Sequence, residues 1–250
     1  MTLLIANWKL APENYAKAES LAKATAKSAK TYKKSIETIV CAPSIYLMAL
    51  SKALKTSLVL GGQTVSSFTD GGHTGDTAAS MLRAAGATYC IVGHSEVRAA
   101  GVTNTDTNTQ IHHLHSAKIT PILCVGETER DAQGFYLSSI KDQIEMALAG
   151  VSAAQLKKLV IAYEPVWAIG KSAVREATPE ECREMIIYIR KIIATLYDIK
   201  LATQITVIYG GSVNEQNADI FLSQGDAQGL LVGRVSTDPK RFAQLMKTIA

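Results

Sequence analysis

Short apolar, β-branched runs recur along the whole 250-residue chain, and amphipathic helical stretches lie between them. Because the runs are apolar on both faces, they predict strands buried on both sides, as in a parallel sheet covered by helices. Eight such runs predict an α/β chain folded as a (β/α)8 barrel. They are Leu3–Ala6, Thr38–Cys41, Leu58–Leu60, Tyr89–Val92, Ile119–Val125, Leu159–Tyr163, Ile205–Tyr209 and Gly229–Val232.

A doubly wound open sheet is the alternative architecture. Such a sheet usually has a glycine-rich loop after its first strand, whereas here that strand ends in Asn7-Trp8-Lys9. No linker-like segment interrupts the chain, so we predict one barrel domain over residues 1–250. The predicted helices include Asn14–Lys30, Ser44–Leu54, Asp76–Ala85, Phe135–Ala149, Pro179–Tyr197 and Pro239–Ile249.

The composition, 47% hydrophobic and 19% charged, is that of an ordinary enzyme. Every apolar run is far shorter than the roughly 20 residues that span a bilayer. The N-terminus reads as a strand and not as a secretory signal, so we expect a cytoplasmic protein without membrane contact. The net charge of +4 is mild, and the sparse aromatic residues are not interleaved with basic ones. Nucleic-acid binding is therefore not expected.

The four cysteines are far apart in the sequence, and three of them lie in predicted strands. This placement predicts buried free thiols and not disulfides or metal ligands. His112, His113 and His115 also suggest a metal site, but only two of them can share a helix face, and no acidic or cysteine ligand is near. We therefore predict no metal.

Polar residues follow several predicted strands, and in a barrel the chemistry collects at these carboxyl ends. Glu164 is fixed at the end of a strand and precedes a glycine-containing lid, residues 170–178, as a general base for proton transfer requires. Lys9 suits a dianionic phosphate or a developing enolate. His94 suits an imidazole donor or shuttle, and a hydrogen-bonded core histidine is the alternative. Glu96 could bind Lys9 and orient it.

The last two predicted strands each end in a glycine-containing turn, Gly210-Gly211-Ser212 and Gly233-Arg234-Val235-Ser236. Such turns expose backbone N–H groups, and each precedes a helix whose N-terminus favours an anion. Together they predict a phosphate site, in the place where this fold usually has one.

Five segments in this order resemble motifs of the triosephosphate isomerase family: Asn7-Trp8-Lys9, Gly93-His94-Ser95-Glu96, Cys124-Val-Gly-Glu127, residues 163–170 and Tyr209-Gly-Gly-Ser212. The resemblance implies an isomerase of glycolysis and gluconeogenesis that interconverts dihydroxyacetone phosphate and D-glyceraldehyde 3-phosphate without a cofactor. It implies that Glu164 is the base, His94 the electrophile, Lys9 and Asn7 substrate ligands and Glu96 a support for Lys9, and that Gly170, Ser212 and the Gly233–Arg234 backbone hold the phosphate.

Four departures from the family pattern stand out. The lid is longer than the usual Gly-Thr-Gly-Lys-Thr-Ala-Thr, and Gly233-Arg234 replaces Gly-Gly. Gln63-Thr64 stands in place of Gln-Asn, and Val97 replaces an arginine. None removes a reacting group. We expect Lys171–Ala177 to be mobile without ligand, and Arg234 to contribute only its backbone N–H.

The segment Gly71–Asp76 resembles a projecting loop that family members insert beside the partner's active site, which implies a homodimer. The match is partial, because His73 replaces a larger residue. Two other functions stay open. Another phosphosugar enzyme on the same barrel would not need Glu164 with His94, and a silent phosphate-binding paralogue would tolerate loss of the base or the lid.

Overall fold

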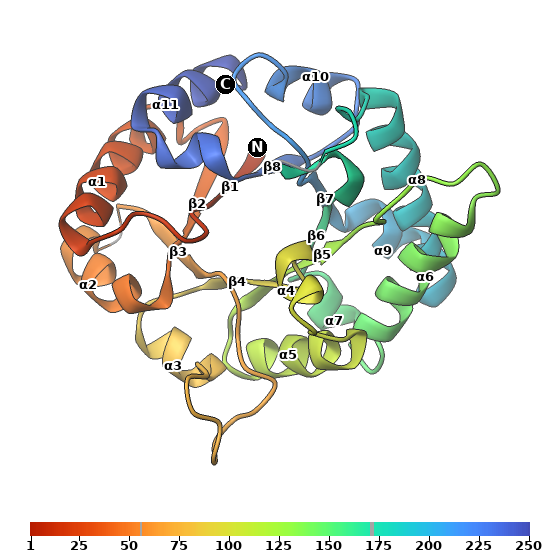
Figure 1. Cartoon of the computed structure of the whole chain (residues 1–250), viewed down its shortest axis with the longest axis horizontal. Coiled ribbons are helices and arrows are strands. Elements are labelled where there is room, and N and C mark those ends of the chain that lie inside the picture. The colour runs from red at the N-terminus through yellow and green to blue at the C-terminus, as the bar shows by residue number, and fades with distance from the viewer. Residues whose placement is uncertain (56, 171–172) are drawn as a thin grey trace.

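In the computed structural model, which describes residues 1–55, 57–170 and 173–250, eight parallel strands close into a barrel surrounded by helices (Figure 1). Each strand pairs with its neighbours in the sequence, and β8 pairs with β1 to close the ring. The predicted (β/α)8 barrel is confirmed. The strands are β1 (Thr2–Asn7), β2 (Ile36–Cys41), β3 (Val59–Gly62), β4 (Tyr89–Val92), β5 (Thr120–Val125), β6 (Val160–Tyr163), β7 (Thr206–Tyr209) and β8 (Gly229–Val232).

Helices cover the outer face of the barrel (Figure 1). The start of α8 shows how the sequence sets a helix boundary: Thr178 and Glu181 form a reciprocal capping box around Pro179. The helices are α1 (Tyr15–Tyr32), α2 (Ser44–Leu54), α3 (Ala79–Ala84), α4 (Ser95–Ala99), α5 (Asn104–Ser116), α6 (Phe135–Ala147), α7 (Ala153–Leu156), α8 (Pro179–Leu196), α9 (Ile199–Gln204), α10 (Ala218–Ser223) and α11 (Pro239–Thr248), with 3-10 turns η1 (Val166–Ala168) and η3 (Arg234–Thr237).

One predicted helix starts later than expected. The segment Asp76–Ala85 becomes helical only at Ala79. The Asp76 carboxylate accepts a hydrogen bond from the Ser66 hydroxyl at 2.6 Å, and the Thr77 carbonyl accepts one from the Ser66 N–H at 2.9 Å. These bonds tie the segment into the loop after β3. The helix α5 is largely polar, so the hydrophobic pattern alone gives little indication of it.

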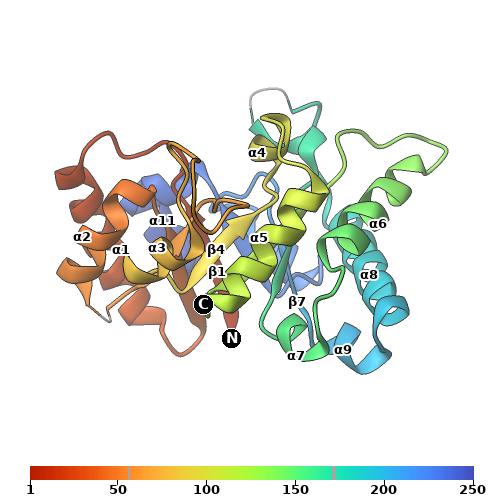
Figure 2. The ribbon, with the colours of Figure 1, turned by 90° about the horizontal axis from the view of Figure 1, so that it is seen from below.

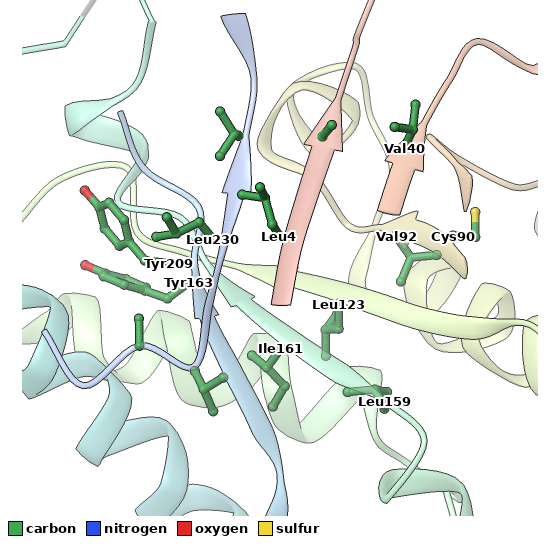
Figure 3. Packing of buried hydrophobic residues seen from close by; sticks show 14 of the residues in the cluster. Leu4, Val40, Cys90, Val92, Leu123, Leu159, Ile161, Tyr163, Tyr209 and Leu230 are labelled. Carbon is green, nitrogen blue, oxygen red and sulfur yellow. The ribbon is translucent and has the colours of Figure 1, made fainter. Parts of the chain in front are cut away.

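The core has two layers, because side chains alternate between the two faces of each strand. Ile5 of β1 belongs to the cluster inside the barrel, with Ile39, Ile91 and Ile122. Its neighbour Leu4 belongs to the larger cluster between strands and helices, whose outward-facing members Figure 3 shows. Both layers exclude water, which explains strands that are apolar throughout. The four cysteines are buried and free, as predicted.

Since all strands are parallel, their carboxyl ends share one rim. In Figure 2 this rim faces upward, with α4 above the barrel and α7, α9 and the N-terminus below. The loop between β3 and α3 projects away from the barrel (Figure 1). None of the helices in the described part of the chain has the length and apolarity that crossing a bilayer requires.

Candidate active site

A cavity of about 660 Å3 opens at the rim formed by the carboxyl ends of the strands. Its wall comes from the segments that follow β1, β4, β6, β7 and β8, which lie far apart in the sequence. The fold brings to this wall every residue that the sequence predicted for the site: Asn7, Lys9, His94, Glu96, Glu164, Gly170, Ser212, Gly233 and Arg234.

Glu164 and His94 form a buried pair at this cavity, with residue exposures of 2% and 6%. The Glu164 Oε1 atom lies 3.2 Å from His94 Nε2, and Oε2 accepts the Ser95 N–H at 3.0 Å. The Glu96 N–H donates to His94 Nδ1 at 3.1 Å. Because Nδ1 is thereby an acceptor, the ring proton resides on Nε2. The imidazole presents a donor toward Glu164.

Lys9 is held in a sparsely populated conformation, with φ at 51°. Its N–H donates to Asn7 Oδ1 at 3.0 Å, and its carbonyl accepts from Gln63 Nε2 at 3.0 Å. Its ammonium lies 2.6 Å from Glu96 Oε1. Partial burial alone would raise the pKa of Glu96, but the hydrogen bond and the charge of Lys9 outweigh it and lower that pKa. A charged side chain is therefore fixed beside the cavity.

The two glycine-containing turns also meet at this cavity. A Cβ at Gly233 would lie 3.5 Å from Lys9 Cε, so this turn adjoins the ammonium chain. A Cβ at Gly211 would lie 2.1 Å from the Tyr209 hydroxyl, so only glycine fits there. The Ser212 hydroxyl donates to the Ala168 carbonyl at 2.7 Å and joins the Gly210–Ser212 turn to the base of the lid.

The Arg234 side chain is exposed and forms no hydrogen bond or ion pair with any residue that the structure describes. Gly170 of the lid lines the same cavity. Gly170 and the lid residues 173–176 are exposed to solvent, whereas Ala177 is buried. The expected mobility of Lys171–Ala177 falls partly on Lys171 and Ser172, which lie outside the described residues.

Two residues escaped the sequence-based assignment, although both stand in the Cys124-Val-Gly-Glu127 motif. Gly126 touches the backbone that carries the candidate base: a Cβ there would lie 1.7 Å from the Glu164 carbonyl oxygen. No other residue type fits this position. The signal was a glycine directly after a strand, but the sequence does not show which backbone approaches it.

Glu127 is the second such residue, a carboxylate that is 2% exposed. Its Oε1 accepts the Tyr163 hydroxyl and the Trp167 indole N–H, both at 2.8 Å. Burial, followed by the charge of Glu127, raises the pKa of Tyr163 strongly, so the phenol stays a donor. Tyr163 and Trp167 flank Glu164 in the sequence. Glu127 therefore fixes the chain on both sides of the candidate base.

The histidine group of α5 is not gathered around a shared point. His112 Nε2 lies 3.0 Å from the Ala149 carbonyl oxygen, so this ring is bonded to the backbone. Across residues 1–55, 57–170 and 173–250, no cluster of three or more His, Cys, Asp or Glu side chains is arranged to hold a metal ion.

Comparison with known proteins assigns the fold to a family. The family model for triosephosphate isomerase matches residues 2–249. The chain is 38% identical over 249 residues to the triosephosphate isomerase of Dictyoglomus thermophilum, with 98% of each chain covered. The chain belongs to the triosephosphate isomerase family. A crystal structure of triosephosphate isomerase from Bartonella henselae superposes with a TM-score of 0.84 at 28% identity, over 99% of this chain and 98% of that one. The triosephosphate isomerase resemblance of the five sequence motifs is thereby confirmed.

Proposed function

We propose that the chain interconverts dihydroxyacetone phosphate and D-glyceraldehyde 3-phosphate, and that no cofactor takes part. The observation that carries the proposal is the 3.2 Å approach of His94 Nε2 to Glu164 Oε1 in a cavity that Lys9 also lines. A carboxylate base, a ring N–H donor and a cation are the groups needed to move a proton between neighbouring carbons beside a carbonyl.

Glu164 removes a proton from the carbon next to the substrate carbonyl, and the electron pair moves onto the carbonyl oxygen to give an enediolate. The His94 Nε2–H hydrogen-bonds to that oxygen, and the Lys9 ammonium stabilises the developing negative charge. The proton of the neighbouring hydroxyl group moves, through the His94 ring, to the former carbonyl oxygen. Glu164 then returns its proton to the carbon that carried the carbonyl, and the new carbonyl forms at the neighbouring carbon. Atoms and charge balance within the substrate, which fits a reaction without a co-reactant.

Glu164 has to leave its present partners before it can act, because its two oxygens are bonded to the Ser95 N–H and lie against His94. Gly210 adjoins this side chain, since a Cβ there would stand 3.0 Å from Glu164 Cγ. The absence of a side chain at this position gives the carboxylate room to turn toward a substrate. Burial of the pair keeps competing water away from the base.

The phosphate of the substrate is assigned to the backbone N–H groups of Gly170, Ser212, Gly233 and Arg234. The first belongs to the lid and the others to the two turns, and all four residues line the same cavity as Lys9. Asn7 is assigned to the substrate as well, and Glu96 to the orientation of Lys9 through their 2.6 Å ion pair. Exposed N–H groups that converge with a nearby cation suit a phosphate dianion.

We further propose that the chain forms one domain over residues 1–250 and assembles as a homodimer. The loop between β3 and α3 projects from the barrel (Figure 1). Phe68 of this loop is 49% exposed, and its ring stacks on His73 with centroids 3.4 Å apart. An exposed aromatic pair on a projecting loop is the kind of apolar surface that a second subunit covers.

A coupled assay with glyceraldehyde 3-phosphate tests the reaction, run beside the Glu164→Gln variant. Isomerase activity that falls by several orders of magnitude in the variant supports the proposal. Activity on other phosphosugars alone would indicate a different enzyme on the same barrel. Binding of the triose phosphates without turnover would indicate a silent phosphate-binding paralogue.

A further inference from the structure

Five side chains form a closed circle of contacts at the base of the lid, and we call it the lid-base ring. The Trp167 N–H donates to Glu127, which pairs with Arg130 at 3.3 Å. Arg130 Nη1 lies 3.3 Å from Glu181 Oε1, and Glu181 accepts both terminal nitrogens of Arg175. The Arg175 guanidinium carbon lies 4.4 Å from the centroid of the Trp167 indole. This contact completes the circle of five side chains.

The lid-base ring joins the two limbs of the lid. Trp167 belongs to η1, at the start of the limb that leads to Gly170, and Arg175 lies on the limb that returns to α8. The Val174 N–H also donates to the Trp167 carbonyl at 2.8 Å, so the limbs are tied by backbone as well. Arg175 belongs to the lid segment that is longer here than in the family pattern. It forms no hydrogen bond or ion pair with Glu164, His94 or Lys9, which all lie in the described part of the chain.

Each contact of Arg175 has a recognisable physical basis. A guanidinium stacks on an indole face through the ring quadrupole, and it binds a carboxylate with two parallel hydrogen bonds. The carboxylate of Glu181 is the better shielded partner, with a side chain 17% exposed against 50% for Arg175. The contacts of Glu181 to Arg130 and to the N-terminus of α8 hold it in place, so Arg175 pairs with a fixed group.

We propose that Arg175 is a positioning residue that holds the lid in the observed conformation, in which Gly170 and residues 173–176 are exposed, and so opposes closure over the phosphate. Only Ala168 and Ile169 separate Trp167 from Gly170 in the chain. If Gly170 moves toward the phosphate turns, Trp167 shifts with it, and its contacts to Arg175 and Glu127 break. A ligand that binds only when the lid is closed therefore binds more weakly, because part of its binding free energy is used to break these contacts.

The test measures the dissociation constant of 2-phosphoglycolate by calorimetry. In Arg175→Gln we expect binding at least threefold tighter than in the parent chain, and a KM that falls while kcat does not rise. A residue that merely stabilised the fold would not tighten binding when removed. Arg183→Gln is the matched control, since Arg183 is exposed on α8 and contacts no charged group in the described residues. Its dissociation constant should stay within about twofold of the parent value.

Glu181→Gln tests the same contact from the other side. Glutamine keeps the capping box of α8 but removes the charge that binds Arg175. This variant should tighten binding as well, and the double variant should bind no tighter than the stronger single one, because the two residues act as one unit. A change below threefold in Arg175→Gln, weaker binding, or additive effects overturns the inference. The inference rests on the proposed function, but the failures differ: a parent chain that does not bind 2-phosphoglycolate refutes the function itself.

Discussion

His94 and Glu164 face each other across 3.2 Å, and the backbone occupies the other hydrogen-bonding atom of each side chain. The Glu96 N–H donates to His94 Nδ1, and the Ser95 N–H donates to Glu164 Oε2. The two functional atoms, Nε2 and Oε1, are therefore directed toward each other. Once Glu164 turns away from His94, as catalysis requires, a bound substrate meets the ring N–H donor on one side and the base on the other.

The length of the base is the first quantity to test. Glu164→Asp should lower kcat by about a hundredfold or more with little change in KM, because one methylene fewer retracts the carboxylate by about 1 Å from the reacting carbon. Steady-state kinetics of the purified variant measure both constants. The fold should persist, because the position stays acidic. Near-normal turnover would mean that another group is the base.

The close approach of Gly126 to Glu164 gives a second test. Gly126→Ala should lower the free energy of unfolding by about 3 kcal/mol or more, because its Cβ would lie 1.7 Å from a backbone oxygen. The Gly126→Ala molecules that still fold should have lost most of their turnover, because strand β6 has to shift and Glu164 shifts with it. Denaturant unfolding and kinetics provide the two measurements. Gly72→Ala is the control, because no atom lies within 4 Å of a Cβ there. Equal stabilities of the two variants would contradict the argument.

The strands and the rim residues could be predicted because each carries a local signal. A run that is apolar on both faces marks a buried parallel strand, and the residue directly after it reaches the rim. Glu164 directly follows such a run, and His94 and Lys9 follow theirs within three residues. The helix start at Asp76 was wrong because a loop contact, the bond from Ser66, decided it.

Contacts between distant segments left no comparable signal. The strained backbone of Lys9 is bonded to Gln63, which is more than fifty residues away, and the lid-base ring unites Glu127 with Glu181. From the sequence alone, charged residues such as Glu127 and Glu181 are predicted to lie on the solvent-exposed surface. Only the closed barrel shows that they meet.

The stability contributed by Glu181 should depend on pH in a defined direction. The hydrogen bond from Arg175 is the main cause that lowers the pKa of Glu181 from 4.5 to about 2. Because the folded pKa is depressed, this stabilisation is complete above about 4.5 and is lost as the pH falls toward about 2. The thermal midpoint of the parent chain should exceed that of Glu181→Gln by a constant margin between pH 7 and 5, and the margin should shrink below. A margin that grows on acidification would refute the assignment.

The homodimer is tested by mass. Light scattering at micromolar concentration should give twice the chain mass of 26.8 kDa. Phe68→Asp should weaken association, because it places a charge on the exposed aromatic pair of the projecting loop. Met81→Asp, a change at an exposed residue of α3 outside that loop, controls for general charge effects. A fully active monomer of the parent chain would exclude the dimer.

Arg234 distinguishes two ways of holding the phosphate. Any residue in this turn offers its backbone N–H, and Lys9 already supplies a cation beside Gly233. We therefore expect the Arg234 side chain to contribute little, although a guanidinium can pair well with phosphate. Arg234→Gly should change KM by less than about threefold, which is under roughly 0.7 kcal/mol. If the side chain did hold the phosphate, KM would rise tenfold or more, and added salt would reduce the difference because exposed charges are screened. Kinetics at two ionic strengths separate a backbone contact from a side-chain contact.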